Sequence, residues 1–140
     1  LETPAPTNDE VLVELHFSGV NPSDVKSRQG AGSGTPAFDR IVPHSDGSGI
    51  ITAVGAGVSQ DRIGERVWIW NGQWQRAYGT AATHIVLHHT QAVVLPDAAI
   101  FETGAILGIP GLTAAHADFG NLALRHIGPC RRPTMCRCLV

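Results

Sequence analysis

The sequence predicts a mainly β fold with short helices, arranged as a partly open β-barrel or a sandwich. Short segments rich in β-branched residues recur along the chain, and Gly and Pro turns separate them. Helical patterns are confined to a stretch after Asn21 and to a stretch that begins at Phe101. With 140 residues, 43% of them hydrophobic and 16% charged, the chain suits one soluble domain with a modest core.

The first strand and the helix after it have clear local signals. Apolar side chains occupy every second position from Val11 to Phe17, which is typical of a half-buried strand. Asn21 can accept a hydrogen bond from a free amide at the start of a helix, and Pro22 suits the first helical position. Gly30 is placed to end this helix.

The central strand is predicted at residues 50–54, which are apolar and largely β-branched. Glycines bracket it and predict turns, bulges or close backbone approaches at positions 47, 49, 55 and 57. Asp46 lies at the mouth of this strand, where its carboxylate can cap backbone amides or face a cleft. Gly55 and Gly57 resemble the start of a dinucleotide fingerprint, but the third glycine is absent and residues 61–66 predict a turn, so a nucleotide loop is excluded here.

The later elements follow the same logic. Strands are predicted at residues 67–70, 83–87 and 92–95, and helices at 101–107 and 113–119, with the Gly108–Gly111 segment breaking the helical stretch. Residues 118–140 have neither periodicity nor turn signals. The organisation expected is therefore one domain over residues 1–117 and a divergent tail over 118–140, disordered or out of frame.

Charge and cysteine content limit the function classes. All 12 acids precede Arg125, whereas four of the ten basic residues lie after Leu124, and the net charge is −2. This balance argues against a nucleic-acid surface, and no apolar run reaches the ~18 residues of a membrane span. The three cysteines lie in the tail and make no disulfide framework, so a cytoplasmic setting is expected. Their spacing with His126 matches no zinc module, and no metal site is predicted there.

A set of short motifs occurs in a recognisable order. It comprises Gly19-Val20-Asn21-Pro22-Ser23-Asp24, the glycine-rich run from Asp46 to Val58, Gly64-Glu65-Arg66-Val67, Leu95-Pro96-Asp97, Glu102-Thr103-Gly104-Ala105 and Leu112-Thr113-Ala114-Ala115. In this order the motifs resemble the zinc-independent quinone oxidoreductase (zeta-crystallin-like) branch of the medium-chain dehydrogenase/reductase superfamily. The resemblance covers about residues 1–117. It implies a GroES-like catalytic domain, and because no glycine-rich loop follows residue 117, the chain is expected to be a fragment that lacks the family's Rossmann domain.

The resemblance also implies chemistry. NADPH would be the cofactor and a quinone or enone the small-molecule substrate, and family members are often homodimers. Zinc-dependent relatives carry a cysteine where Asn21 stands and a His-Glu pair where Ser45 and Asp46 stand, so no zinc is expected. An alcohol needs a Lewis acid before hydride leaves it, whereas a quinone is already an electrophile.

The same resemblance nominates the site residues. Asn21 would lie at the cleft, near the nicotinamide, and donate to a developing oxyanion as the catalytic residue; the alternative is a helix N-cap. Thr113 would place its hydroxyl near the nicotinamide; its alternative is an N-cap after Gly111. Asp24 is expected to form a cap or a salt bridge.

Trp70 and Trp74, in an aromatic segment with Trp68 and Tyr78, are candidates for the wall of a substrate pocket that accepts a flat ring; the alternative is ordinary core or loop packing.

The sequence is compatible with three functions. The first is an NADPH:quinone oxidoreductase domain that is inactive as this chain alone. The second is a non-catalytic GroES-like binding module or a nonfunctional truncated gene product. The third is a relative of the zinc-type alcohol dehydrogenases.

Overall fold

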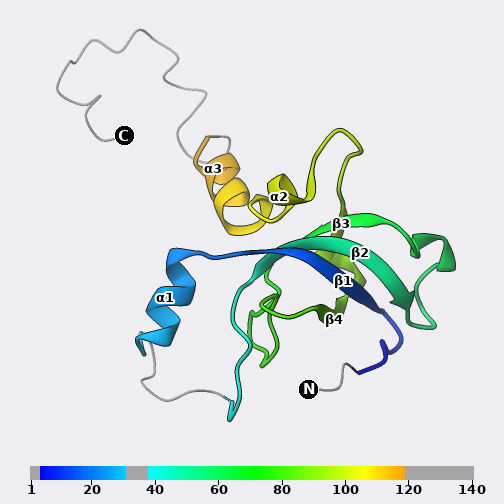
Figure 1. Ribbon diagram of the computed structural model, residues 1–140, viewed down its shortest axis with the longest axis horizontal. Helices are drawn as coiled ribbons and strands as arrows, with labels where there is room; N and C mark the ends of the chain where they lie inside the picture. Colours follow the sequence, from blue (N-terminus) through cyan, green and yellow to red (C-terminus); the bar gives the residue numbers. More distant parts are fainter. Residues whose placement is uncertain (1–3, 31–37, 119–140) are drawn as a thin grey trace, which may run out of the picture.

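The computed structural model describes residues 4–30 and 38–118, and a single antiparallel sheet of five strands organises them. The strand order is β4-β1-β2-β3-β5 (Figure 1). The strands are β1 (Glu10–Gly19), β2 (Asp46–Val54), β3 (Arg66–Ile69), β4 (His84–His88) and β5 (Ala92–Val94). All five predicted strands are confirmed, and β2 begins four residues earlier than the apolar run of residues 50–54 indicated.

Short helices connect and cover the sheet. They are α1 (Pro22–Arg28), the 3-10 turns η1 (Gln60–Arg62) and η2 (His89–Gln91), α2 (Phe101–Gly104), the π-helical turn η3 (Leu107–Gly111) and α3 (Leu112–Ala115). Figure 1 shows α1 beyond the end of β1, and the segment from α2 to α3 across the upper side of the sheet. None of the helices in residues 4–30 and 38–118 has the length and hydropathy of a membrane span.

The sheet curls until its two edges come close together. β4 and β5 are the edge strands, yet only the three residues of η2 separate them in the chain. The Arg62 guanidinium donates to the carbonyls of His89 at 3.0 Å and Ala92 at 2.7 Å, at the two ends of this connection. A flat sheet of this order would hold its edges four strand spacings apart. The predicted partly open barrel is therefore confirmed.

The core lies on the inner face of this curled sheet. Its members alternate along the strands, as period-two burial requires. They are Val11 and Val13 of β1, Ile51 of β2, Val67 and Ile69 of β3, Ile85 and Leu87 of β4, Ala92 of β5, and Val58 from the connection between β2 and β3. Full burial of one such aliphatic side chain contributes about 1.5–3 kcal/mol.

Two bulges in the β1–β2 pair cancel each other. The register shifts between Leu12 and Val13, where Thr52 is the extra residue on β2, and again between Leu15 and Phe17, where His16 is the extra residue on β1. The second shift restores the register of the first pairs. As a result Gly19 pairs with Asp46 at the far end of the ladder.

The predicted helix break at residues 108–111 is wrong. These residues form η3, and the Gly111 amide bonds the carbonyl of Ile106 at 3.2 Å, five residues back. A π-helical turn of this kind accommodates Pro110, which has no amide hydrogen to donate. The predicted tail lies, apart from Asp118, outside the described residues, and so does the His126 cysteine group.

The glycine at position 49 is needed for close backbone approach. A Cβ added there would lie 1.9 Å from the Glu14 carbonyl oxygen of the neighbouring strand. We expect Gly49→Ala to lower the free energy of unfolding by about 1–3 kcal/mol, because the two central strands must move apart. Chemical denaturation monitored by circular dichroism measures this change.

Gly111→Ala is the matched control. Gly111 has helical backbone angles, and its added Cβ would meet nothing closer than 3.5 Å. We expect this variant to be neutral or up to about 1 kcal/mol more stable, as alanine favours helix. Equal losses in the two variants would contradict the close-approach argument.

Candidate functional site

A buried carboxylate at the start of β2 is the centre of the candidate site. Asp46 has no exposed surface, and its Oδ2 accepts two hydrogen bonds of 2.8 Å, one from the Asn21 Nδ2 and one from the Ile109 backbone amide. Of the two roles open to Asp46 from the sequence, capping a backbone amide is confirmed. Burial raises the pKa of the Asp46 carboxyl, while the hydrogen bonds from Ile109 and Asn21 act to lower it.

Asn21 is placed beside Asp46 by the end of β1. The ladder pairs Gly19 with Asp46, and the chain then turns into α1, so Asn21 reaches the carboxylate from the residue that precedes the helix. Its exposed fraction is only 3%. One amide hydrogen of Asn21 is therefore committed to the protein and is not free to donate to a ligand.

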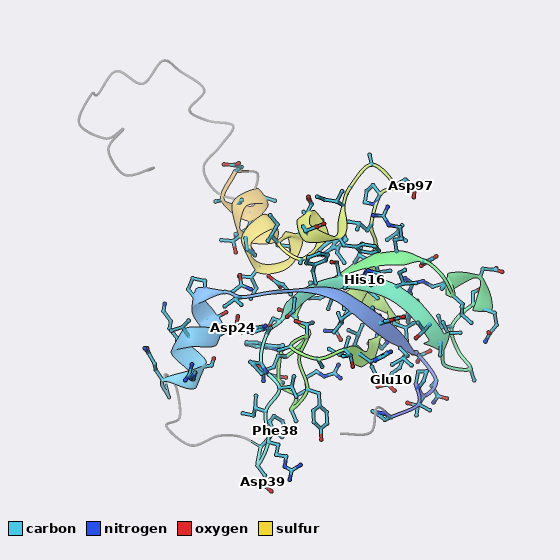
Figure 2. The ribbon with its side chains drawn as sticks, in the orientation of Figure 1. Glu10, His16, Asp24, Phe38, Asp39 and Asp97 are labelled. Atoms are coloured by element: carbon cyan, nitrogen blue, oxygen red, sulfur yellow. The ribbon has the colours of Figure 1, made fainter. Side chains whose placement is uncertain are left out.

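Asp24 holds the backbone of the same residue. Its Oδ2 accepts from the Asn21 backbone amide at 2.7 Å, which is the return bond of a capping box. The expectation that Asp24 forms a cap is confirmed. Figure 2 shows Asp24 on α1, beyond the end of β1.

The second carboxylate oxygen faces a glycine. Asp46 Oδ1 is a buried acceptor without a hydrogen-bond partner among the described residues. A Cβ added to Gly108 would lie 2.1 Å from it, so only glycine lets η3 close on the carboxylate. Sequence reasoning missed the roles of Gly108 and Ile109, because Gly and Pro there were interpreted as a break; the only local signal was the pair of glycines at 108 and 111.

A chain of hydrogen bonds supports the backbone of Asp46. The Thr80 hydroxyl donates to the Asp46 carbonyl at 2.6 Å, so its oxygen accepts from Ser18 at 3.0 Å. The Ser18 oxygen then accepts from the Nδ1–H of His44 at 2.9 Å, which places a proton on Nδ1 of that ring. His44 has a φ of 73°, in the left-handed region, and this chain fixes the turn that leads into β2.

A cleft of about 200 Å³ opens beside these groups. It is lined by Ser23, Asp24, Ser27, Ser45, Asn71, Gln73, Trp74 and Ile109. Among these lining residues, Trp74 is 66% exposed. Trp70 does not line this cleft, because its indole donates to the Thr90 carbonyl at 3.1 Å. The structure therefore separates the two tryptophans that the sequence grouped.

Thr113 lies inside α3, exposed, four residues after Ile109 along the same continuous helical stretch. The alternative of an N-cap at Thr113 is wrong, because Gly111 precedes the helix and the turns before it are already helical. Its proposed contact with a nicotinamide stays a prediction.

A larger cleft, about 380 Å³, lies along β4. Val42, Tyr78 and Ile85 give it a mainly apolar wall, and Arg76 reaches into it while donating to the Val86 carbonyl. Burial lowers the pKa of the Arg76 guanidinium, and the charge of Glu10 opposes this. Of the predicted aromatic segment, Tyr78 lines this cleft, whereas Trp74 lines the smaller one together with Asp24 and Ile109, which hydrogen-bond to Asn21 and Asp46 respectively. The smaller cleft is therefore the candidate site.

The Gly64–Val67 motif has a structural role. Arg66 donates to the carbonyls of Asp97 at 3.2 Å and Ala99 at 2.5 Å, and its guanidinium lies 4.7 Å from the centre of the Phe101 ring. His16 contacts the same ring, with centroids 4.4 Å apart. These contacts attach the start of α2 to the sheet, which positions η3 over Asp46.

Comparison with known proteins identifies the family of this domain. Residues 7–97 match the model of the alcohol dehydrogenase GroES-like domain. The chain is 37% identical over 122 residues to the Rattus norvegicus quinone oxidoreductase and 33% identical over 127 residues to the Homo sapiens synaptic vesicle membrane protein VAT-1 homolog. These alignments cover 87% and 88% of this chain, but only 36% and 30% of the relatives.

Solved structures agree with this picture. The Escherichia coli quinone oxidoreductase in complex with NADPH superimposes with a TM-score of 0.74 at 27% identity. The superposition covers 86% of this chain and 35% of that one. The chain thus spans about a third of the length of the relatives that it matches.

The ligand chemistry of the site predicts that zinc is not held. In residues 4–30 and 38–118, no three His, Cys, Asp or Glu side chains are grouped as metal ligands, and Asn21 faces Asp46 through its amide nitrogen, which cannot ligate. We expect less than stoichiometric zinc by elemental analysis after dialysis. One tightly held zinc per chain would overturn a zinc-independent assignment.

Proposed function

The chain belongs to the alcohol dehydrogenase GroES-like domain family and resembles its quinone oxidoreductase members, so we propose that it forms the substrate-side domain of a zinc-independent NADPH:quinone oxidoreductase. The reaction would pass a hydride from the reduced nicotinamide to a quinone or other conjugated carbonyl, with uptake of a proton by the acceptor oxygen. The alternatives of a non-catalytic binding module and of a zinc-type alcohol dehydrogenase relative predict different outcomes in the experiments below and in the zinc measurement above.

The observation that carries the proposal is the buried Asn21–Asp46 pair beside the small cleft. Asn21 is 3% exposed, Asp46 is fully buried, and they bond at 2.8 Å. A fixed polar group next to a concave surface that also has an aromatic wall, Trp74, suits a flat ring with oxygen substituents. No Lewis acid is required for such an acceptor, since its carbonyl is already polarised.

The residues present fit only one end of the cofactor. A cleft of about 200 Å³ is smaller than the ~300–1,000 Å³ of typical ligand pockets and can take a single ring. The start of α1 does not suit a diphosphate, because Pro22 has no amide hydrogen and the Asp24 carboxylate occupies the Asn21 amide. Bound NADPH would supply the hydride; this chain would contact its nicotinamide end.

Each site residue then has a restricted task. The Asn21 amide would orient a carbonyl or carboxamide at the cleft with the hydrogen and lone pairs that Asp46 leaves unused. The Thr113 hydroxyl would approach the nicotinamide from the side of α3. Trp74 would cover one face of the ring, while Trp70 fixes the loop behind it through Thr90.

A titration with duroquinone tests where a quinone binds. This quinone is fully substituted, so the cysteines cannot add to its ring. We expect amide shifts in ¹H–¹⁵N spectra at Ser23, Asp24, Ser45 and Ile109. Trp74→Ala should weaken binding about threefold to tenfold, the loss of one aromatic contact.

Tyr78→Ala, which removes an exposed ring that lies outside the small cleft, should leave the Kd unchanged. Shifts confined to the β4 cleft, at Ile85 and Tyr78, would reject this site. An absence of any saturable shift would favour the non-catalytic module.

A second measurement concerns the cofactor. Most of the binding free energy of a dinucleotide comes from phosphate and ribose contacts, and a few contacts at the nicotinamide end do not offset the cost of immobilising the ligand. We therefore expect this 140-residue chain alone neither to bind NADPH measurably in calorimetry nor to reduce quinones. Micromolar binding, about −8 kcal/mol, would contradict this and would require a phosphate site elsewhere in the chain.

A further inference from the structure

One oxygen atom joins three distant segments of the chain. Asp46 Oδ2, at the start of β2, accepts from the side chain of Asn21, 25 residues earlier, and from the backbone of Ile109, 63 residues later, each at 2.8 Å. Charge-assisted hydrogen bonds of this length are among the strong ones in proteins. The atom is buried, so water does not compete for it.

The carboxylate also decides which way the Asn21 amide points. An ionised carboxylate oxygen only accepts, so the amide nitrogen must face it and the amide oxygen must face away. The backbone of the same residue is held separately, through its amide and Asp24 at 2.7 Å. Asn21 is thereby fixed both along the chain and about its side-chain torsions.

The bond to Ile109 fixes the second half of the arrangement. Ile109 lies in η3, which runs directly into α3 and so carries Thr113. Gly108 lets this turn approach, since a Cβ there would lie 2.1 Å from Oδ1 and 2.6 Å from Cγ of Asp46. The distance between Asn21 and the helical segment that holds Thr113 therefore depends on this carboxylate, in addition to the contacts that attach α2 to the sheet.

We propose that Asp46 is a positioning residue, which sets the orientation of the Asn21 amide and the placement of the η3–α3 segment against it. The purpose of this positioning rests on the proposed function: it would align a flat acceptor between Asn21 and Thr113. Its geometric content is independent of any ligand. Asp46 itself touches no ligand, because it has no exposed surface.

The first experiment reads the geometry without ligand. In ¹H–¹⁵N spectra of the full chain, the Asn21 side-chain NH₂ and the Ile109 amide report the two bonds. In Asp46→Ala both signals should lose their hydrogen-bonded shifts, and exchange of the Ile109 amide should accelerate at least about tenfold. Asp46→Asn should rescue both signals in part, because the amide oxygen of that variant can still accept both bonds.

Gly108→Ala is the second variant, and it keeps the carboxylate itself. The added methyl group should push η3 away and shift the same two signals, while the amides of Val11 and Val67 in the core stay unchanged. Asp39→Asn is the charge control: Asp39 is exposed and lies at the opposite end of the view in Figure 2 from α2 and α3. It should leave both signals in place.

The duroquinone titration then separates the two proposals. If the two signals respond as expected, and if quinone binding weakens in the same variants, Asp46 is a positioning residue for the site. Unchanged Asn21 and Ile109 signals in both Asp46→Ala and Gly108→Ala would overturn the inference, even if the wild-type chain binds quinone. Responsive signals without any quinone binding in the wild type would instead reject the proposed function and leave the geometric inference standing.

Discussion

The antiparallel pairing of β1 with β2 is the constraint on which the rest of the structure depends. It supplies the centre of the sheet, and its register places Asp46 opposite Gly19. Two bulges that cancel each other keep that register while the strands bend. A slip of one residue would turn the carboxylate away from Asn21 and invert the core face of β2. The candidate site is therefore a consequence of strand register more than of any loop.

The carboxylate at this junction is retained at an energetic cost. Burial raises the pKa of Asp46, because the charged carboxylate is less favourable in the folded protein than in water. An apolar residue of similar volume is often as stable at such a position, or more so. It could not, however, fix the direction of a neighbouring amide. Two strong donors on Oδ2 offset part of this cost and keep the directional effect, whereas Oδ1, which has no partner among the described residues, adds to it.

The sequence predicts the elements with purely local signals and misses what depends on distant contacts. Alternation in β1 and the Asn21-Pro22 start of α1 suffice, because period and capping are properties of neighbouring residues. The π-helical turn at 107–111 is not predictable in this way, since it needs the Asp46 carboxylate to bond the Ile109 amide. The aromatic segment fails for the same reason: a partner at Thr90 decides where Trp70 points. Asn21 was identified by resemblance, but its amide partner came only from the structure.

The strand order also has a consequence for synthesis of the chain on the ribosome. β1 lies between β2 and β4 in the sheet, yet β4 is made last of the three. Synthesis proceeds at roughly 5–20 residues per second. One edge of β1, which includes Val11 and Val13, therefore stays unpaired for seconds before residues 84–88 emerge. During that interval the edge is a template for any other extended chain. Transient capture by a chaperone at this edge would thus protect the nascent domain until its last partner strand arrives.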